Sequence, residues 1–117
     1  MASGFVEPIA SIRTGSVSGI TSSSTQSLAD LGIIPDIKGM YVLFLQTDYI
    51  YNSGTASAYI VYRLSTLYAV TPIVEGSAST APRIEPGNSA TATSNGILKT
   101  LSSSTGSTIY YAILKIS

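Results

Sequence analysis

The 117-residue sequence contains no His, no Cys and no Trp. Without Cys there is no disulfide, no thiolate nucleophile and no Cys-based zinc site. Without His, the commonest metal ligand and the usual general base near neutral pH are missing. A chain of this length forms one domain with a core large enough to fold without a disulfide or a metal. The composition therefore argues against most enzymatic chemistry, and we expect no catalytic centre, no cofactor and no metal.

Charged residues are also scarce, at 10% of the chain against about 25% in an average soluble domain. Six basic side chains balance six acidic ones, and the polar positions are filled instead by 20 Ser and 13 Thr. A neutral surface repels its own copies weakly, whereas nucleic acid and anionic lipid require clustered Lys or Arg. We therefore expect association between copies of the chain, and neither a nucleic acid nor a membrane as partner.

Long apolar runs are absent as well. The longest, such as 40–45, span about six residues, far short of the roughly 20 that cross a bilayer. The first five residues lack the basic and apolar regions of a secretory signal, and the retained Met1 favours synthesis in the cytoplasm. A hydroxyl-rich, charge-poor surface is more usual outside cells. A protein made inside a host and displayed outside by assembly would satisfy both indications.

From Met40 onward the residues favour β-strands. The stretch 40–51 is rich in aromatic and branched side chains, and 58–64 follows as the second strand of a hairpin whose turn contains Asn52, Ser53 and Gly54. Both faces of the first strand are apolar at its start, which predicts a central strand covered on both sides. In the second strand, Arg63 marks the face that we expect to meet water.

Further strands are indicated towards the C-terminus. The stretch 67–74 is either broken or bent at Pro72, and 83–85 is a short strand. Asn95-Gly96 suits a type I′ turn between strands at 90–94 and 97–101. The last strand, 108–116, is apolar on both faces apart from Lys115, which again predicts cover on both sides.

The first 39 residues differ, because they are mostly small and polar. We interpret 1–39 as an N-terminal arm or edge strand and 40–117 as the β-sandwich core. Within the first part, 27–31 could form one helical turn that Gly32 stops, too short for a stable isolated helix. The predicted fold is all-β: a single-domain β-sandwich, jelly-roll-like, or a small barrel, with an extended N-terminal arm. Its edges carry few Lys or Pro, so we expect the arm or a neighbouring copy to cover them.

Candidate catalytic groups are isolated in the sequence. No Asp-rich calcium loop and no Ser-x-x-Lys pattern is present, and a serine nucleophile would have only Lys as its base. Two carboxylates could still converge in space, as glycosidases require, but solvated surface charge is the simpler interpretation. The six carboxylates are Glu7, Asp30, Asp36, Asp48, Glu75 and Glu85.

Eight Tyr residues are the feature that most suggests recognition. Tyr combines a large apolar face with a polar tip, which suits protein interfaces and sugar stacking, although it is also an ordinary core or sheet residue. Tyr49, Tyr51 and Tyr59 flank the turn at 52–57, so they could cluster at one end of the sheet. We take these three as candidate interface or glycan-contact residues, with burial in the core as the alternative.

In its overall composition and strand pattern the chain resembles small structural proteins of viruses, especially capsid decoration proteins and fibre or spike modules of phages and archaeal viruses. The resemblance rests on the retained Met1, the hydroxyl-rich loops at 21–25 and 102–107, the low charge and the C-terminal strand at 109–116. It implies β-sandwich or jelly-roll domains, symmetric homo-oligomers, attachment to a major capsid or tail protein, and no catalysis.

The leading hypothesis is therefore a non-enzymatic virion protein, a decoration or minor capsid protein, that joins copies of itself through sheet and arm contacts. A receptor- or carbohydrate-binding module at a fibre or spike tip, with a host glycan as ligand, is one alternative. A subunit of a microbial extracellular filament or surface layer is another, which would place the protein on an extracellular surface instead of in a virion.

Overall fold

A computed structural model describes residues 11–35, 37–48, 54–64, 68–85 and 96–117. Within these ranges the chain forms seven β-strands and no helix. The strands are β1 (Ser11–Ile20), β2 (Gly39–Thr47), β3 (Ala56–Arg63), β4 (Tyr68–Val74), β5 (Pro82–Glu85), β6 (Ile97–Thr100) and β7 (Ser107–Lys115).

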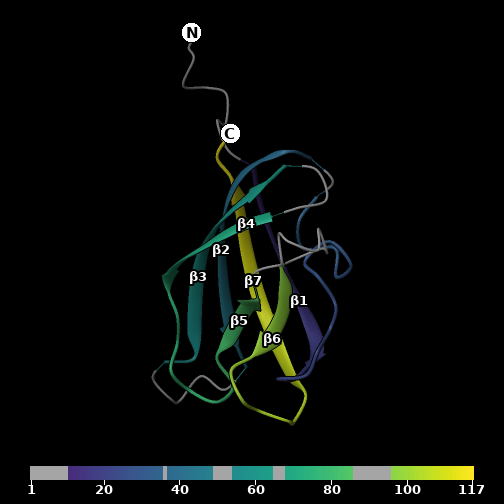
Figure 1. Cartoon of the computed structure of the whole chain (residues 1–117), viewed down its shortest axis with the longest axis vertical. Coiled ribbons are helices and arrows are strands. Elements are labelled where there is room, and N and C mark those ends of the chain that lie inside the picture. The colour runs from purple at the N-terminus through teal and green to yellow at the C-terminus, as the bar shows by residue number, and fades with distance from the viewer. Residues whose placement is uncertain (1–10, 36, 49–53, 65–67, 86–95) are drawn as a thin grey trace, which may run out of the picture.

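Five strands form one antiparallel sheet in the order β1-β7-β2-β3-β4 (Figure 1). The expected hairpin is confirmed, because Phe44 of β2 lies opposite Ala58 of β3. The C-terminal strand β7 lies between β1 and β2, and it places Ala112 on the other side of Phe44. Strand β2 is therefore the middle of the sheet, while β1 and β4 form its two edges.

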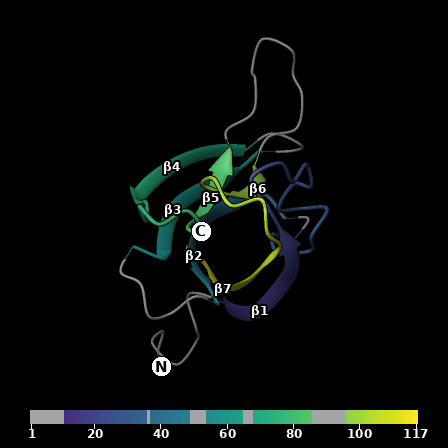
Figure 2. The same cartoon turned by 90° about the horizontal axis from the view of Figure 1, so that it is seen from below.

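The remaining strands, β5 and β6, pair with each other as a second, smaller sheet. Figure 2 shows the large sheet as a curve that runs from β4 to β1, with β5 and β6 on its open side. The hydroxyl of Ser57 in β3 donates a hydrogen bond of 2.7 Å to the carbonyl of Pro82 in β5, so the two sheets are joined. The predicted all-β, single-domain sandwich is confirmed.

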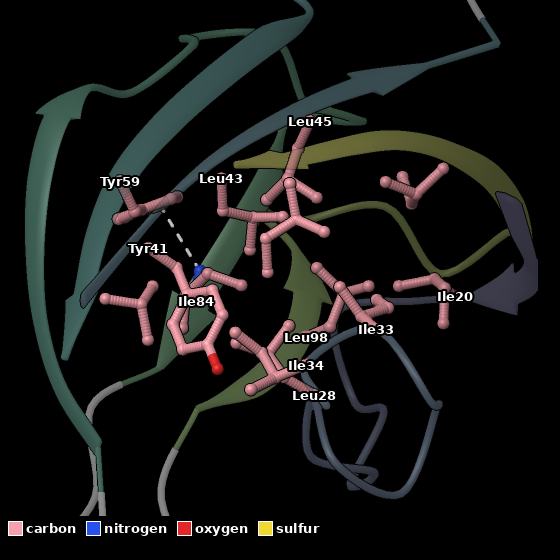
Figure 3. Close-up of a cluster of buried hydrophobic side chains, with 13 residues drawn as sticks. Ile20, Leu28, Ile33, Ile34, Tyr41, Leu43, Leu45, Tyr59, Ile84 and Leu98 are labelled. Carbon is pink, nitrogen blue, oxygen red and sulfur yellow. Dashed lines mark hydrogen bonds between the residues drawn. The ribbon is translucent and has the colours of Figure 1, made fainter. Parts of the chain in front are cut away.

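The core lies between the two sheets (Figure 3). Alternate residues of β2 are buried from Gly39 to Thr47, as expected for a strand with one face towards a core. Each sheet supplies apolar side chains, and so does the segment between β1 and β2. The buried cluster consists of Ile20, Leu28, Ile33, Ile34, Tyr41, Leu43, Leu45, Tyr59, Val61, Ile84, Leu98, Ile109 and Ile113.

Two predictions about strand faces are wrong. The second face of β2 and β7 is open in the chain itself, where Phe44 is 50% exposed and Tyr110 is 51% exposed. Arg63 lies on the inner face of β3, only 8% exposed, and donates a hydrogen bond of 2.6 Å to the carbonyl of Pro35. The small second sheet covers one face only, and the loop before β2 supplies an acceptor for the buried guanidinium.

Two further predictions concern the bend at Pro72 in β4 and the pairing of β6. Strand β4 is continuous, and Pro72 lies at a bulge where the register with β3 shifts, which confirms the bent alternative. Strand β6 pairs with β5, and the amide of Leu98 donates to the carbonyl of Gln26 on its other side. Both sides of β6 are thus occupied, and the strand expected at 90–94 lies outside the described residues.

Residues 11–34 belong to the same compact unit as the rest of the described chain. Strand β1 is an edge strand paired with β7, as one of the two interpretations of 1–39 predicted. The chain then crosses to the second sheet, where Leu28 is fully buried. The predicted single turn at 27–31 is confirmed by a hydrogen bond from the amide of Leu31 to the carbonyl of Ser27, and Gly32 follows with a φ of 73°.

Candidate assembly surface

The sheet face that points away from the core is the surface of the described structure that most suggests a contact with another molecule. Residues that lie directly opposite each other in an antiparallel pair project from the same face, so the register assigns this face strand by strand. We call it the outer face. It consists of Ile12, Thr14 and Ser16 of β1, Tyr110, Ala112 and Leu114 of β7, Met40, Val42, Phe44 and Gln46 of β2, Ala56, Ala58, Ile60 and Tyr62 of β3, and Ala69, Thr71 and Val74 of β4.

Apolar side chains dominate the outer face. Among the described residues, ten large hydrophobic side chains are exposed, and six of them lie on this face or at its β4 margin. Their exposed fractions range from 37% for Ile60 to 71% for Ile12. Isolated exposed apolar residues are normal, but a contiguous group marks a contact surface. The six residues are Ile12, Phe44, Ile60, Ile73, Val74 and Tyr110.

Across the described strands, the outer face carries no charged side chain. Arg13 of β1 lies opposite Ile113, and Lys115 of β7 lies opposite Tyr41, so both belong to the inner side of the sheet. The guanidinium of Arg13 donates a hydrogen bond of 3.1 Å to the carbonyl of Gly32. An uncharged apolar surface of this kind resembles the buried centre of a protein interface, where charged residues are depleted.

A groove of about 580 Å³ crosses the middle of the outer face. Its lining includes Phe44 and three small residues, Ala56, Ala58 and Ala112, with Tyr110 on the β7 side. Phe44 lies between Ala58 and Ala112 in register, so a large side chain stands directly beside two small ones. This arrangement gives the face relief, a projecting ring beside a depression.

The two sheet edges differ in how they are protected. At β4, Pro72 lacks an amide proton and the register shifts beside it, and both features oppose pairing with another strand. At β1 the register also shifts between Val17 and Ile20. The open apolar face is therefore a more prominent candidate contact surface than the β4 edge.

The structure places the candidate tyrosines differently from one another. Tyr59 is 1% exposed and lies in the core, which is the alternative weighed from the sequence, so its ring does not reach the surface. Burial first, and then its hydrogen bond to Glu75, raise the pKa of Tyr59 above the ordinary value of 10.0. Tyr49 and Tyr51 lie outside the described residues. The exposed aromatic residues of the groove, Phe44 and Tyr110, were not selected from the sequence, although the apolar second face of β2 and β7 was the signal for them.

All four carboxylates in the described ranges have structural partners, while Glu7 and Asp36 lie outside those ranges. Asp30 accepts a hydrogen bond from the amide of Ser27, and Asp48 accepts one from the hydroxyl of Thr47. The carboxylate of Glu75 accepts a hydrogen bond of 2.6 Å from the hydroxyl of Tyr59 and lies 3.7 Å from the guanidinium of Arg83. Glu85 forms an ion pair of 2.5 Å with Lys99 across the β5–β6 pair. In the described part of the chain, no three Asp or Glu residues are grouped so that they could hold a metal ion.

No helix among the described residues is long and apolar enough to cross a membrane. Comparisons of the chain with protein-family models, with curated proteins and with solved structures give no match.

Proposed function

We propose that this protein is a non-enzymatic structural subunit that assembles through the outer face of its five-stranded sheet, as a decoration or minor capsid protein of a virion. The observation that carries the proposal is the contiguous, uncharged, apolar outer face around Phe44. Burying such a face against a partner removes apolar surface from water, which is the main driving force of protein association.

Two further observations support assembly. The formal net charge of the chain is zero, so copies do not repel one another at long range. The face is built on the middle strands of a hydrogen-bonded sheet, so it meets a partner with little loss of backbone freedom. The virion setting is the part of the proposal that derives from the hydroxyl-rich, charge-poor composition.

Sedimentation velocity over a series of protein concentrations tests the proposal. The wild-type chain is expected to form species larger than its 12.2 kDa monomer, whereas Phe44→Glu is expected to remain monomeric, because a carboxylate at the centre of the face would be buried without a partner. Leu101→Glu is the matched control: Leu101 is 43% exposed and follows β6, away from the outer face.

A wild-type chain that stays monomeric at every concentration would overturn the proposal, and so would a Phe44→Glu variant that assembles as the wild type does. The virion setting has its own test in the genome that encodes the chain. Neighbouring reading frames for capsid, portal or tail proteins would support it, and neighbouring frames for secretion or cell-wall proteins would contradict it.

A further inference from the structure

We infer that the occupant of the outer face is a second copy of this chain, related by a two-fold axis, with the Phe44 ring of each copy inserted into the alanine-lined groove of the other. This inference rests on the proposed function and specifies its partner and geometry. It follows from three properties of the face: its area, its lack of charge and its relief.

The area suits a stable dimer. The six large side chains named above average about half exposed, which corresponds to roughly 500–600 Å² of accessible surface if each offers about 150–200 Å² in full. Partly exposed neighbours such as Val42, Tyr62 and Leu114 extend the face towards the roughly 800 Å² per partner of a standard interface. The six side chains alone therefore reach the upper part of the roughly 300–600 Å² that the largest apolar patch of an ordinary monomer covers, and the partly exposed neighbours bring the face closer to the size of a dimer interface.

The lack of charge restricts the class of partner. Because no Lys, Arg, Asp or Glu projects from the face along the described strands, it offers no complement to a phosphate or to a strongly charged protein. Its complement is another uncharged apolar surface. A second copy supplies that surface by definition, and two sheets pack face to face about 10 Å apart in β-sandwiches.

The relief makes the face self-complementary. A two-fold interface brings the same patch of both subunits together, so each projection must meet a depression of the same patch. Phe44 is the projection, at 50% exposure. The groove is lined by Ala58, which is 6% exposed, and by Ala112, and these two small residues lie on either side of Phe44 in register. An axis in the interface plane, between Phe44 and this groove, seats both rings at once.

The inference is tested by exchanging the projection and the depression between two variants. Phe44→Ala removes the ring, and Ala112→Phe fills the groove. Each variant alone is expected to raise the dissociation constant of the dimer at least tenfold, the size expected for a central anchor of an interface.

An equal mixture of the two variants is expected to form heterodimers with a dissociation constant within about threefold of the wild-type value. In that mixture the intact Phe44 enters an intact groove, while the ring introduced by Ala112→Phe occupies the space left by the truncated residue. The two variants carry different fluorophores, and energy transfer between them measures the heterodimer. Ala29→Phe is the control, since it adds the same ring at an exposed alanine outside the face.

Far-UV circular dichroism and thermal unfolding establish that each variant is folded before the association is measured. Recovery in the mixture cannot arise from misfolding, because a misfolded subunit would not restore a native interface. If the wild type dimerises and Phe44→Glu prevents it, but the mixture does not recover, the inference is overturned while the proposed function stands. If the wild type remains monomeric, both fail.

Discussion

At the scale of single residues, the hydroxyl of Tyr59 joins three parts of the chain. It donates a hydrogen bond to Glu75, directly after β4, and accepts one of 3.3 Å from the amide of Ile84 in β5, which Figure 3 marks. The pKa of this hydroxyl is raised in the folded chain, so the folded state holds the proton more tightly than the unfolded state. Its contribution to stability is therefore complete below pH 10 and is lost as the pH rises above 10.

We expect Tyr59→Phe to lower the free energy of unfolding at neutral pH by about 1–3 kcal/mol, because a buried amide loses its acceptor. The variant should also lose less stability than the wild type between about pH 9 and pH 11, since the titrating group is gone. Urea unfolding followed by circular dichroism at each pH measures both effects. Tyr110→Phe, at a half-exposed ring, is the control, and equal pH slopes for Tyr59→Phe and the wild type would contradict the expectation.

The residue scale is also where prediction from the sequence was weakest. Tyr59 was a candidate contact residue with the core as its alternative, and Arg63 was expected to meet water, whereas both lie on the inner face of β3. Alternation along a strand assigns residues to two faces but does not say which face a second sheet will cover. In β3 that choice depends on β5, whose carbonyl at Pro82 accepts a hydrogen bond from Ser57.

At the scale of elements, the turn at 27–31 guides the chain from the large sheet to the small one. The hydroxyl of Ser27 accepts a hydrogen bond of 3.1 Å from the amide of Asp30, and the carboxylate of Asp30 accepts one of 3.2 Å from the amide of Ser27. This reciprocal pattern is the capping arrangement that begins a helical turn. It holds Leu28 in the core, where it is fully buried.

Replacing Ser27 with alanine is expected to destabilise the folded chain by about 1 kcal/mol, because the Asp30 amide loses the side-chain acceptor that caps the start of the turn. Thermal and urea unfolding provide the measurement. Ser104→Ala, in an exposed loop, makes the same chemical change and should leave stability within about 0.5 kcal/mol of the wild type. Equal losses in the two variants would show that the cap contributes nothing.

Elements with strong local patterns were predicted correctly. The β2–β3 hairpin, the bend in β4, the short strand β5 and the C-terminal strand all lie close to their expected positions. The partner of β6 was not predicted. Asn95-Gly96 suggested a local hairpin, but β6 pairs with β5, which brings Ile84 and Leu98 together in the core. The propensity of Asn-Gly to form a turn depends only on residues next to each other in the sequence. The burial of Ile84 and Leu98 depends instead on how all the strands of the sandwich pack together.

At the scale of the whole molecule, the uncharged outer face determines how association should respond to salt. Raising the NaCl concentration from about 0.05 M to about 1 M screens charge–charge attraction but does not weaken apolar contacts, and sulfate strengthens them. The dissociation constant of the wild-type assembly should therefore stay constant or fall as salt increases. Sedimentation velocity at several salt concentrations measures it, and an assembly that dissociates at the highest NaCl concentration would contradict an apolar interface.

The sequence by itself determined the class of fold, the scarcity of charge and the expectation of assembly, because these follow from composition and from strand periodicity. It also indicated that both faces of β2 and β7 are apolar. Only the tertiary structure decided which of those faces is the core: β5, β6 and the segment containing Leu28 cover the inner face, and no described element covers the outer one. Periodicity is a property of one strand, whereas coverage depends on segments far away in the sequence, so the surface around Phe44 became visible only in the folded chain.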